Sequence, residues 1–572
     1  MKEFINKCRY YLFYGFFISM FVNVLQLTFS IYMLQVYDRV LTSYSVSTLL
    51  VITIAAVICL IVLALLEWIR SRLLIRAGIE FNAVLSNDVL YKNLESSADF
   101  GQQARQGTIK DVQTIRNFLS GSSVFAFFDI PWMPIYFLLI FVLHPALGFV
   151  ALGGGLCVLC IGVAAQKLTA GDLQQANAVN GTASGFLGAA LRNGSAVRSM
   201  GMAHSVIRRW SRMNNDVVGL QTRASRKAGL LQSTNKALRM GLQVLIYAVG
   251  AYLTVTHEST AGIMIAASII MGRALAPIDQ AMSSYRLSLE AKDSYKRLKA
   301  TLDQPSSQPP MPLPAPTGEI TVENLLFGPP GQPIIKNISF KLAAGDTLAV
   351  IGPSASGKST LCRLLLGLWK PLAGKIRFDG ADIASWDPER LGEHVGYLPQ
   401  EVELFTGTIA ENIARMNEVD SDAVIRAAEL AGVHKLILNL PKGYDTPIDE
   451  RGAALSGGQR QRVGLARAMY GDPKIVVLDE PNSNLDEEGE TGLIKAIQHL
   501  KSQAATIILV THKPAILGIA DKILMMQQGQ VAFFGPRQEV LAQLNTLQQK
   551  QRQLMQQRLE AQQREEAMRR AM

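Results

Sequence analysis

Residues 352–360 read GPSASGKST and match the phosphate-loop pattern G-x-x-x-x-G-K-[ST]. The apolar run 348–351 predicts a buried strand before the loop, and residues 360–368 predict a helix after it, which is the context that the pattern requires. In such a loop, backbone N–H groups surround a phosphate, the lysine reaches the terminal phosphates, and the following hydroxyl binds Mg²⁺. The sequence therefore predicts a site for ATP or GTP with Mg²⁺, made by Gly352, Pro353, Ser354, Ala355, Ser356, Gly357, Lys358, Ser359 and Thr360.

Four polar side chains farther along the chain complete a hydrolytic set. The apolar strand in KIVVLDE (474–480) ends in Asp479 and Glu480. Asp479 is placed to hold Mg²⁺ together with Ser359, and Glu480 can polarise an attacking water. Gln400 follows the short apolar stretch VGYLPQ and is predicted to reach both the metal and that water, while His512, after the strand 506–510, is predicted to contact the γ-phosphate. Together these residues predict one site for nucleotide hydrolysis.

A second glycine-rich stretch, LSGGQ at residues 455–459, opens a predicted helix. Ser456 can cap that helix, and Gly457 and Gly458 let its first amides approach an anion closely. With the phosphate loop and the carboxylate pair, this stretch makes the second half of the chain resemble an ATP-binding cassette ATPase. In that resemblance Gln400 is the Q-loop glutamine, residues 483–486 (SNLD) are the D-loop, His512 is the switch histidine, and 450–452 (ERG) precede the signature.

The resemblance implies two cassettes paired head to tail, with the phosphate loop of one facing LSGGQ of the other across ATP. The ATP contacts implied at the signature side are Ser456, Gly457, Gly458, Gln459 and Asp486. Because the chain has one cassette, it is expected to work as a homodimer. Where such cassettes usually have an adenine-stacking tyrosine, residues 327–330 read FGPP, so Phe327 either stacks on the base or belongs to the strand core.

The first half of the 572-residue chain has the composition of a membrane domain. The mean hydropathy of the chain is +0.19, and the long uncharged runs lie before the cassette. We attribute the net charge of +10 to basic cytoplasmic loops, and we expect no nucleic-acid partner. The five cysteines are expected to be reduced packing residues. Six membrane spans are predicted, near residues 11–36, 48–69, 124–143, 146–165, 238–255 and 261–278, the last interrupted by Arg273.

The expected fold is a six-helix transmembrane domain of the type I ABC exporter kind, followed by an α/β phosphate-loop cassette. Basic residues gather before the first span and in the two long connections, so both termini and the ATPase are expected in the cytoplasm. The helical spacing of those connections predicts cytoplasmic extensions of the spans. The predicted limits are 1–303 for the membrane domain, 304–316 for a proline-rich linker, 317–541 for the cassette and 542–572 for a Gln/Arg/Glu-rich helical tail.

Two stretches of the membrane half narrow the resemblance. YMLQVYDRVLTS (32–43) and FDIPWMPIY (128–136) are similar to the bacterial type I secretion ATPases that export proteases, lipases and haem-binding proteins. This resemblance implies an inner-membrane exporter of an unfolded polypeptide with an uncleaved C-terminal signal. It also implies a periplasmic adaptor and an outer-membrane channel as partners, besides the secreted polypeptide and membrane lipid. About ten residues precede the first span, so no leader-cleaving domain is expected.

Some alternatives stay open at this level. The same architecture suits an exporter of lipid or small hydrophobic molecules, and a cassette that gates a membrane complex without moving cargo is a more distant possibility. Asp129 lies in FDIPWMPIY, where Pro131 and Pro134 must kink a helix. Its carboxylate either faces a translocation path or is hydrogen-bonded at the helix bend. Residues 107–117 and 192–202 fall where exporters place the coupling helices that touch the cassettes.

Overall fold

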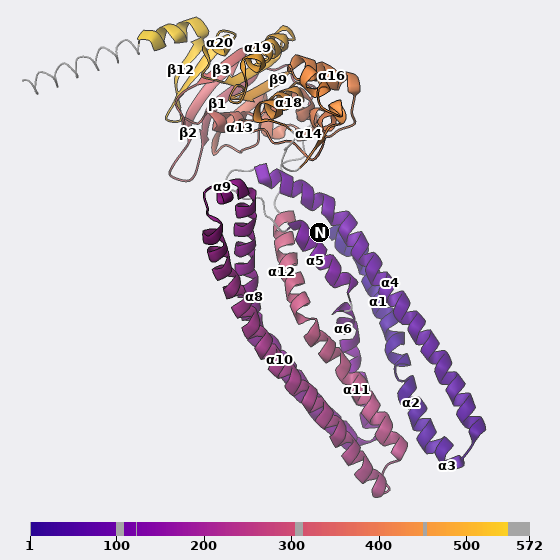
Figure 1. Cartoon of the computed structure of the whole chain (residues 1–572). Helices are drawn as coiled ribbons and strands as arrows, with labels where there is room; N and C mark the ends of the chain where they lie inside the picture. Colours follow the sequence, from indigo (N-terminus) through magenta and orange to yellow (C-terminus); the bar gives the residue numbers. More distant parts are fainter. Residues whose placement is uncertain (1, 99–107, 122, 304–312, 450–454, 547–572) are drawn as a thin grey trace, which may run out of the picture. The chain divides into compact units, whose positions relative to one another are not determined.

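The computed structural model describes residues 2–98, 108–121, 123–303, 313–449 and 455–546 (Figure 1). The chain divides into two compact units: the first comprises Met1–Ser97 and Gln103–Gln304, and the second comprises Ala98–Gln102 and Pro305–Met572, so the main division is at the start of the expected linker. Most of the linker and the end of the tail, residues 304–312 and 547–572, lie outside the described residues, as do residues 450–452 of the expected ERG stretch. The exact domain limits therefore stay predictions.

The first unit contains helices and the turns that join them, and no strand, in its described residues. Six of its helical stretches are long and apolar enough to cross a membrane, and the six predicted spans fall within them. Several run far beyond the apolar windows: α4 and α10 have 53 residues each, which at 1.5 Å per residue gives about 80 Å. The helices are α1 (Lys2–Leu25), α2 (Thr28–Gln35), the π-helix η1 (Val36–Val40), α3 (Leu41–Ser43), α4 (Val46–Ala98), α5 (Thr108–Ser120), α6 (Ser123–Asp129), the 3₁₀ turn η2 (Ile130–Trp132), α7 (Met133–Leu143), α8 (Pro145–Arg192), α9 (Gly194–Ser199), α10 (Ala203–Val255), α11 (Ala261–Ser283) and α12 (Tyr285–Leu302).

The core of this unit lies where α7, α8, α10 and α11 meet. Its buried side chains include Tyr136, Leu147, Ile246 and Met271. Helices α8 and α10 run side by side along most of their length (Figure 1). Gly154 permits their close approach, because a Cβ there would overlap the side chain of Leu242. A smaller core joins α4, α5 and α12.

The third span is broken as its two prolines predict. Helix α6 ends at Asp129, η2 forms one 3₁₀ turn, and α7 begins at Met133. The break leaves Asp129 hydrogen-bonded rather than facing an open path: its Oδ1 accepts from Asn23 Nδ2 at 2.8 Å and from Arg70 Nη1 at 3.2 Å. The structure thus favours the second of the two interpretations of Asp129.

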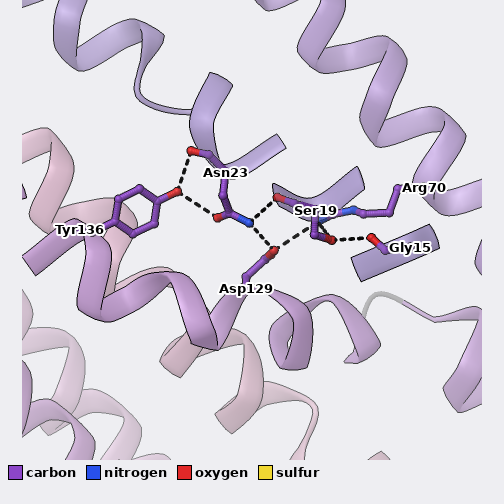
Figure 2. Close-up of polar contacts among 6 residues, drawn as sticks. All are labelled: Gly15, Ser19, Asn23, Arg70, Asp129 and Tyr136. Carbon is purple, nitrogen blue, oxygen red and sulfur yellow. Dashed lines mark hydrogen bonds and ion pairs between the residues drawn. The ribbon is translucent and has the colours of Figure 1, made fainter. Parts of the chain in front are cut away.

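Figure 2 shows the polar network built on this contact, which joins the first, second and third spans. Tyr136 donates to the backbone oxygen and to Oδ1 of Asn23, both at 2.9 Å. Arg70 also donates to Ser19 Oγ at 3.1 Å. The side chains of Arg70 and Asp129 are only 6% and 13% exposed, so the ion pair is buried. This network fixes α1 against α4 and the α6–α7 break.

The second unit is built on two main sheets. A six-stranded sheet has the order β12-β11-β3-β10-β9-β6 and is parallel except for β12, and a four-stranded antiparallel sheet has the order β2-β1-β4-β5. The strands are β1 (Ile320–Phe327), β2 (Ile335–Leu342), β3 (Thr347–Ile351), β4 (Ala373–Phe378), β5 (Ala381–Asp382), β6 (Val395–Leu398), β9 (Ile475–Asp479), β10 (Thr506–Val510), β11 (Lys522–Gln527) and β12 (Gln530–Pro536), with β7 (Gly407–Thr408) and β8 (Pro447–Ile448) in a separate pair.

Strands β3, β9 and β10 are almost fully buried, as their continuous apolar runs predict for a covered parallel sheet. Helix α13 (Lys358–Leu365) packs with both sheets in one core. A second core joins β9 and β10 to the helices α15 (Ile409–Ile413), α16 (Ser421–Leu430), α17 (His434–Leu438), α18 (Gly457–Met469) and α19 (Glu487–Ser502). Smaller elements are η3 (Ile383–Ser385), α14 (Pro388–His394), η4 (Gly443–Asp445) and α20 (Pro514–Leu517).

Candidate active site

The phosphate loop runs from the end of β3 to the start of α13. Gly352 has φ +152° and Gly357 has φ +98°, values that side-chain-bearing residues rarely adopt. A Cβ on Gly352 would overlap the backbone oxygen of Met526, and one on Gly357 would lie 2.9 Å from Ile335 Cδ1. Only glycine therefore lets the loop turn this tightly against β11 and β2, and the turn leaves the first amides of α13 at its inner edge.

Lys358 and Ser359 are the first two residues of α13. Lys358 is 7% exposed, and its Nζ donates to the backbone oxygens of Gly352 and Pro353 at 2.9 and 3.1 Å. The ammonium is thus held inside the curl of the loop. The Ser359 hydroxyl hydrogen-bonds the carboxylate of Asp479, which is the last residue of β9.

The carboxylate of Asp479 lacks a full set of partners in the described part of the chain. It is 2% exposed, and its Oδ1 has no hydrogen-bond partner there. Burial raises the pKa of Asp479, and the neighbouring Glu480 raises it further, while Ser359, Arg363 and Lys358 oppose the shift. The buried Ser356 Oγ also has no partner among the described residues. A buried carboxylate oxygen and hydroxyl without partners fit a loop that holds a metal ion and phosphate oxygens.

Glu480 is held by hydrogen bonds to its backbone and to its side chain. Its backbone has φ +50°, an uncommon value for a residue other than glycine, and its N–H donates to Val510 O at 3.1 Å. Its Oε2 accepts from Gln400 Nε2 at 2.9 Å. Glu480 and His512 line one open cavity of about 240 Å³ together with Asn482, Ser483, Thr511 and Lys513. The structure therefore brings Gln400, Asp479, Glu480 and His512 together beside the phosphate loop.

Gln461 is a residue of this region that the sequence patterns did not single out. It lies in α18, is 2% exposed, and donates from Nε2 to Pro481 O at 2.7 Å and to Glu480 O at 3.2 Å. Its Oε1 accepts from the N–H of Asn484 at 3.0 Å. Gln461 therefore holds the chain after Glu480 against the signature helix. The signal available in the sequence was a glutamine at helical spacing from Gly464, Leu465 and Ala468, on an otherwise apolar helix face.

The signature residues lie at the start of α18. Ser456 and Gln459 form a capping box, with Gln459 N donating to Ser456 Oγ at 3.3 Å and Ser456 N donating to Gln459 Oε1 at 2.8 Å. A Cβ on Gly458 would lie 2.6 Å from Asn484 O. No hydrogen bond between the phosphate loop and these residues is present in the described part of the chain. Their contact with ATP across a pair of cassettes stays a prediction.

Asp486 has a local structural role besides the predicted one. Its Oδ1 accepts from Gly489 N at 2.9 Å and pairs with Arg462, so it caps α19. The hydrogen bond from Gly489 and the Arg462 guanidinium lower the pKa of Asp486. The side chain is nevertheless 69% exposed, so one face of the carboxylate is open to a partner.

Phe327 belongs to the strand core, which resolves the alternative left by the sequence. It is 5% exposed and stacks on Trp369, with ring centroids 5.2 Å apart and an interplanar angle of 14°. The Arg363 guanidinium lies over the ring of Trp369, 4.8 Å from its centroid. The ring of Phe327 is therefore occupied by packing and is not presented to a nucleotide base.

Comparison with known proteins agrees with these features. Residues 12–275 match the ABC transporter transmembrane region, and residues 335–483 match the ABC transporter family. The chain is 41% identical over 540 residues to the type I secretion system ATP-binding protein PrsD of Rhizobium meliloti (strain 1021), covering 94% of this chain and 93% of that protein. It is 28% identical over 539 residues to the leukotoxin translocation ATP-binding protein LktB of Mannheimia haemolytica, covering 93% and 76%.

A solved structure supports the fold. The chain matches a bacterial Atm1-family ABC exporter with ATP bound at a TM-score of 0.82 and 23% identity, covering 94% of this chain and 96% of that one. The fold and the site define an ABC transporter with fused membrane and ATPase domains, as the sequence predicts. The chain belongs to the ABC transporters and, within them, to the type I secretion ATP-binding proteins.

Proposed function

We propose that the chain is the ATPase and permease subunit of a type I secretion system, which moves an unfolded polypeptide out across the inner membrane at the expense of ATP. The 41% identity to PrsD over nearly the whole chain carries this proposal, because that protein is named for type I secretion. LktB is named for translocation of a leukotoxin, which makes a polypeptide cargo the natural expectation. An uncleaved C-terminal signal on the cargo, a periplasmic adaptor and an outer-membrane channel are parts of the same proposal.

The residues of the site fit ATP with Mg²⁺. Bound Mg²⁺ would neutralise developing charge on the phosphates and orient them, and Ser359, Asp479 and Gln400 are the residues that would hold it. Lys358 and the loop amides would bind the phosphates. Glu480 would accept a proton from the attacking water, with Gln400 holding the carboxylate through its Nε2 and His512 orienting the water from the same cavity.

The proposed assembly is a homodimer with its termini and cassettes in the cytoplasm. The phosphate loop and the signature capping box are both present in one chain, and no hydrogen bond joins them in its described part, which suits a head-to-tail pair. Many basic residues lie in the parts of the long helices beyond the predicted spans, which supports the orientation. Closure of the pair on ATP would drive the membrane helices, and hydrolysis would reset them.

The experiment compares proteins in the culture medium of the native host with those of a strain carrying Glu480→Gln in the chromosomal gene. We expect one or a few unprocessed polypeptides to disappear from the medium and to accumulate inside the cells. A strain carrying Glu403→Gln is the matched control, since Glu403 lies outside the hydrolytic set and offers its backbone oxygen to Arg467. Unchanged secretion in the Glu480→Gln strain, with altered membrane lipid, would instead identify a lipid exporter.

A further inference from the structure

The stretch 32–43 (YMLQVYDRVLTS) has no role in the ATPase site, yet it carries an unusual local structure. Helix α2 passes into a π-helix at Val36–Val40, and α3 ends at Tyr44 in the left-handed region with φ +51°. A π-turn inserts one extra residue into a helix and redirects the side chains on it, and such turns occur often at functional sites. The side chain of interest on this π-helix is Asp38, because it contacts the start of α11.

Asp38 completes the N-terminus of α11, which lies 222 to 224 residues farther along the chain. Thr260, the N-cap of α11, accepts from Ile263 N at 3.2 Å and donates from Oγ1 to Asp38 Oδ2 at 2.7 Å. Asp38 Oδ1 accepts from Gly262 N at 3.0 Å. Two of the otherwise unpaired N–H groups of α11 are therefore satisfied, one by its own cap and one by the first span. The negative charge also favours this end of the helix.

Gly262 makes the contact sterically possible. It is buried, and a Cβ at this position would lie 2.5 Å from Asp38 Oδ1. The contact lies where the first span turns into the second and the fifth turns into the sixth, so both turns are at the same side of the membrane. Because the termini are proposed to lie in the cytoplasm, these two turns face the outer side of the membrane. Figure 1 shows the α3 turn and the start of α11 at the same end of the long helices.

The first span thus has two polar contacts of different character. The inner one, Arg70–Asp129 with Asn23, is buried, so breaking it would leave a charge without a partner in a dry environment. The outer one is half-exposed at Asp38 and exposed at Thr260, so water can reach the carboxylate and the hydroxyl when the contact opens. Between them the helix is interrupted at Gln26 and Leu27, which separate α1 from α2.

We propose that Asp38 is a positioning residue that latches the outer ends of the first and sixth spans together, and that this latch opens and re-forms in each transport cycle while the Arg70–Asp129 contact stays closed. The inference rests on the proposed export function. In this mechanism α1 stays fixed to α4 and α6, while α2 and the outer part of α4, which Tyr32 and Thr53 join, separate together from α11 to open the path outward. The break at Gln26 and Leu27 supplies the bend.

The test measures the distance across the latch in the full-length homodimer in lipid nanodiscs. The five native cysteines are replaced, and spin labels are placed at Tyr44, which is 89% exposed, and at the exposed His257. Labelled protomers are diluted with unlabelled ones, so that distances within one protomer dominate. In the Glu480→Gln background we expect ATP with Mg²⁺ to shift the distance distribution to longer values. An unchanged distribution in protein that has bound ATP overturns the latch and leaves the export function untouched.

A matched label pair reports a contact that should not move. Ile31 on α2 and Val51 on α4 are exposed and flank the hydrogen bond between Tyr32 Oη and Thr53 Oγ1 at 3.1 Å. Their distance is expected to stay the same with and without ATP. If both pairs lengthen together, the first span separates from the second, and the proposed division into a fixed and a moving contact is wrong.

A second measurement is independent of nucleotide. Asp38→Ala removes both hydrogen bonds and is expected to shift the nucleotide-free population toward the longer distance about fivefold, the usual effect of losing one helix cap. Thr260→Val removes the hydrogen bond from Thr260 to Asp38 and the cap on Ile263 N, but it keeps the bond from Gly262 N to Asp38. Because one of the two bonds to Asp38 remains, a smaller shift in the same direction is expected even if Asp38→Ala does not fold. A nucleotide-free distribution identical to that of the parent in Thr260→Val, and in Asp38→Ala where it folds, overturns the proposal.

Discussion

Removing Asp129 should destabilise the membrane unit mainly through the charge that it leaves behind. In Asp129→Ala, Arg70 loses its ion-pair partner at 3.2 Å while its side chain remains 6% exposed, and its Nε already lacks a partner within the described residues. Breaking a buried ion pair from one side costs about 3–5 kcal/mol. Arg70 keeps Ser19 Oγ and the face of Phe125, whose centroid is 4.1 Å away, so we expect the lower end, about 3 kcal/mol.

The assay is a double-mutant cycle on unfolding in mixed SDS micelles, followed by protease resistance of the membrane unit. Asp129→Ala and Arg70→Met are compared singly and together. The double variant should be less destabilised than the sum of the single changes by about 2–3 kcal/mol, because it no longer buries an unpaired charge. The matched control is Asp172–Lys227, whose side chains are 22% and 48% exposed and whose coupling should stay below about 1 kcal/mol. Equal coupling for the two pairs would refute the reasoning.

Three further outcomes are expected. Glu480→Gln should keep ATP binding and slow steady-state hydrolysis by about 10²- to 10⁴-fold, measured by phosphate release, and normal turnover would exclude Glu480 as the base. Phe327→Leu should leave nucleotide affinity within about twofold but lower the cassette's melting temperature, because the ring packs on Trp369; a large affinity loss at unchanged stability would place the ring on the base. Folding lowers the pKa of Asp486. The charged carboxylate therefore contributes to the stability of the cassette above the pKa of the unfolded state, and this contribution is lost as the pH falls through the pKa of the folded state. Asp486→Asn should flatten the acid limb of cassette stability, and an identical pH profile would contradict this.

Patterns that depend on neighbouring residues were predictable. The strand before residue 352, the helix after it and the tight turn between them follow from apolar runs and glycines, and the structure places them as expected. The break of the third span at Asp129 follows from Pro131 and Pro134 in the same way. Which side chains pack against each other across the fold could not be predicted. Phe327 had two interpretations because whether an aromatic ring faces a ligand or the core depends on Trp369, which pairs with it only after two strands and a helix have packed.

The sequence by itself determined the class of protein. The phosphate loop, the signature helix and the six apolar segments each consist of contiguous residues, and the spacing of those residues already fixes the backbone conformation. Only the tertiary structure decided what the charged residues of the membrane half do. Asp129 meets Arg70 across 59 residues of chain, and Asp38 meets Gly262 across 224. The physical reason is that a carboxylate in an apolar helix must find donors wherever the fold supplies them, and helix packing rather than local sequence selects which donors those are.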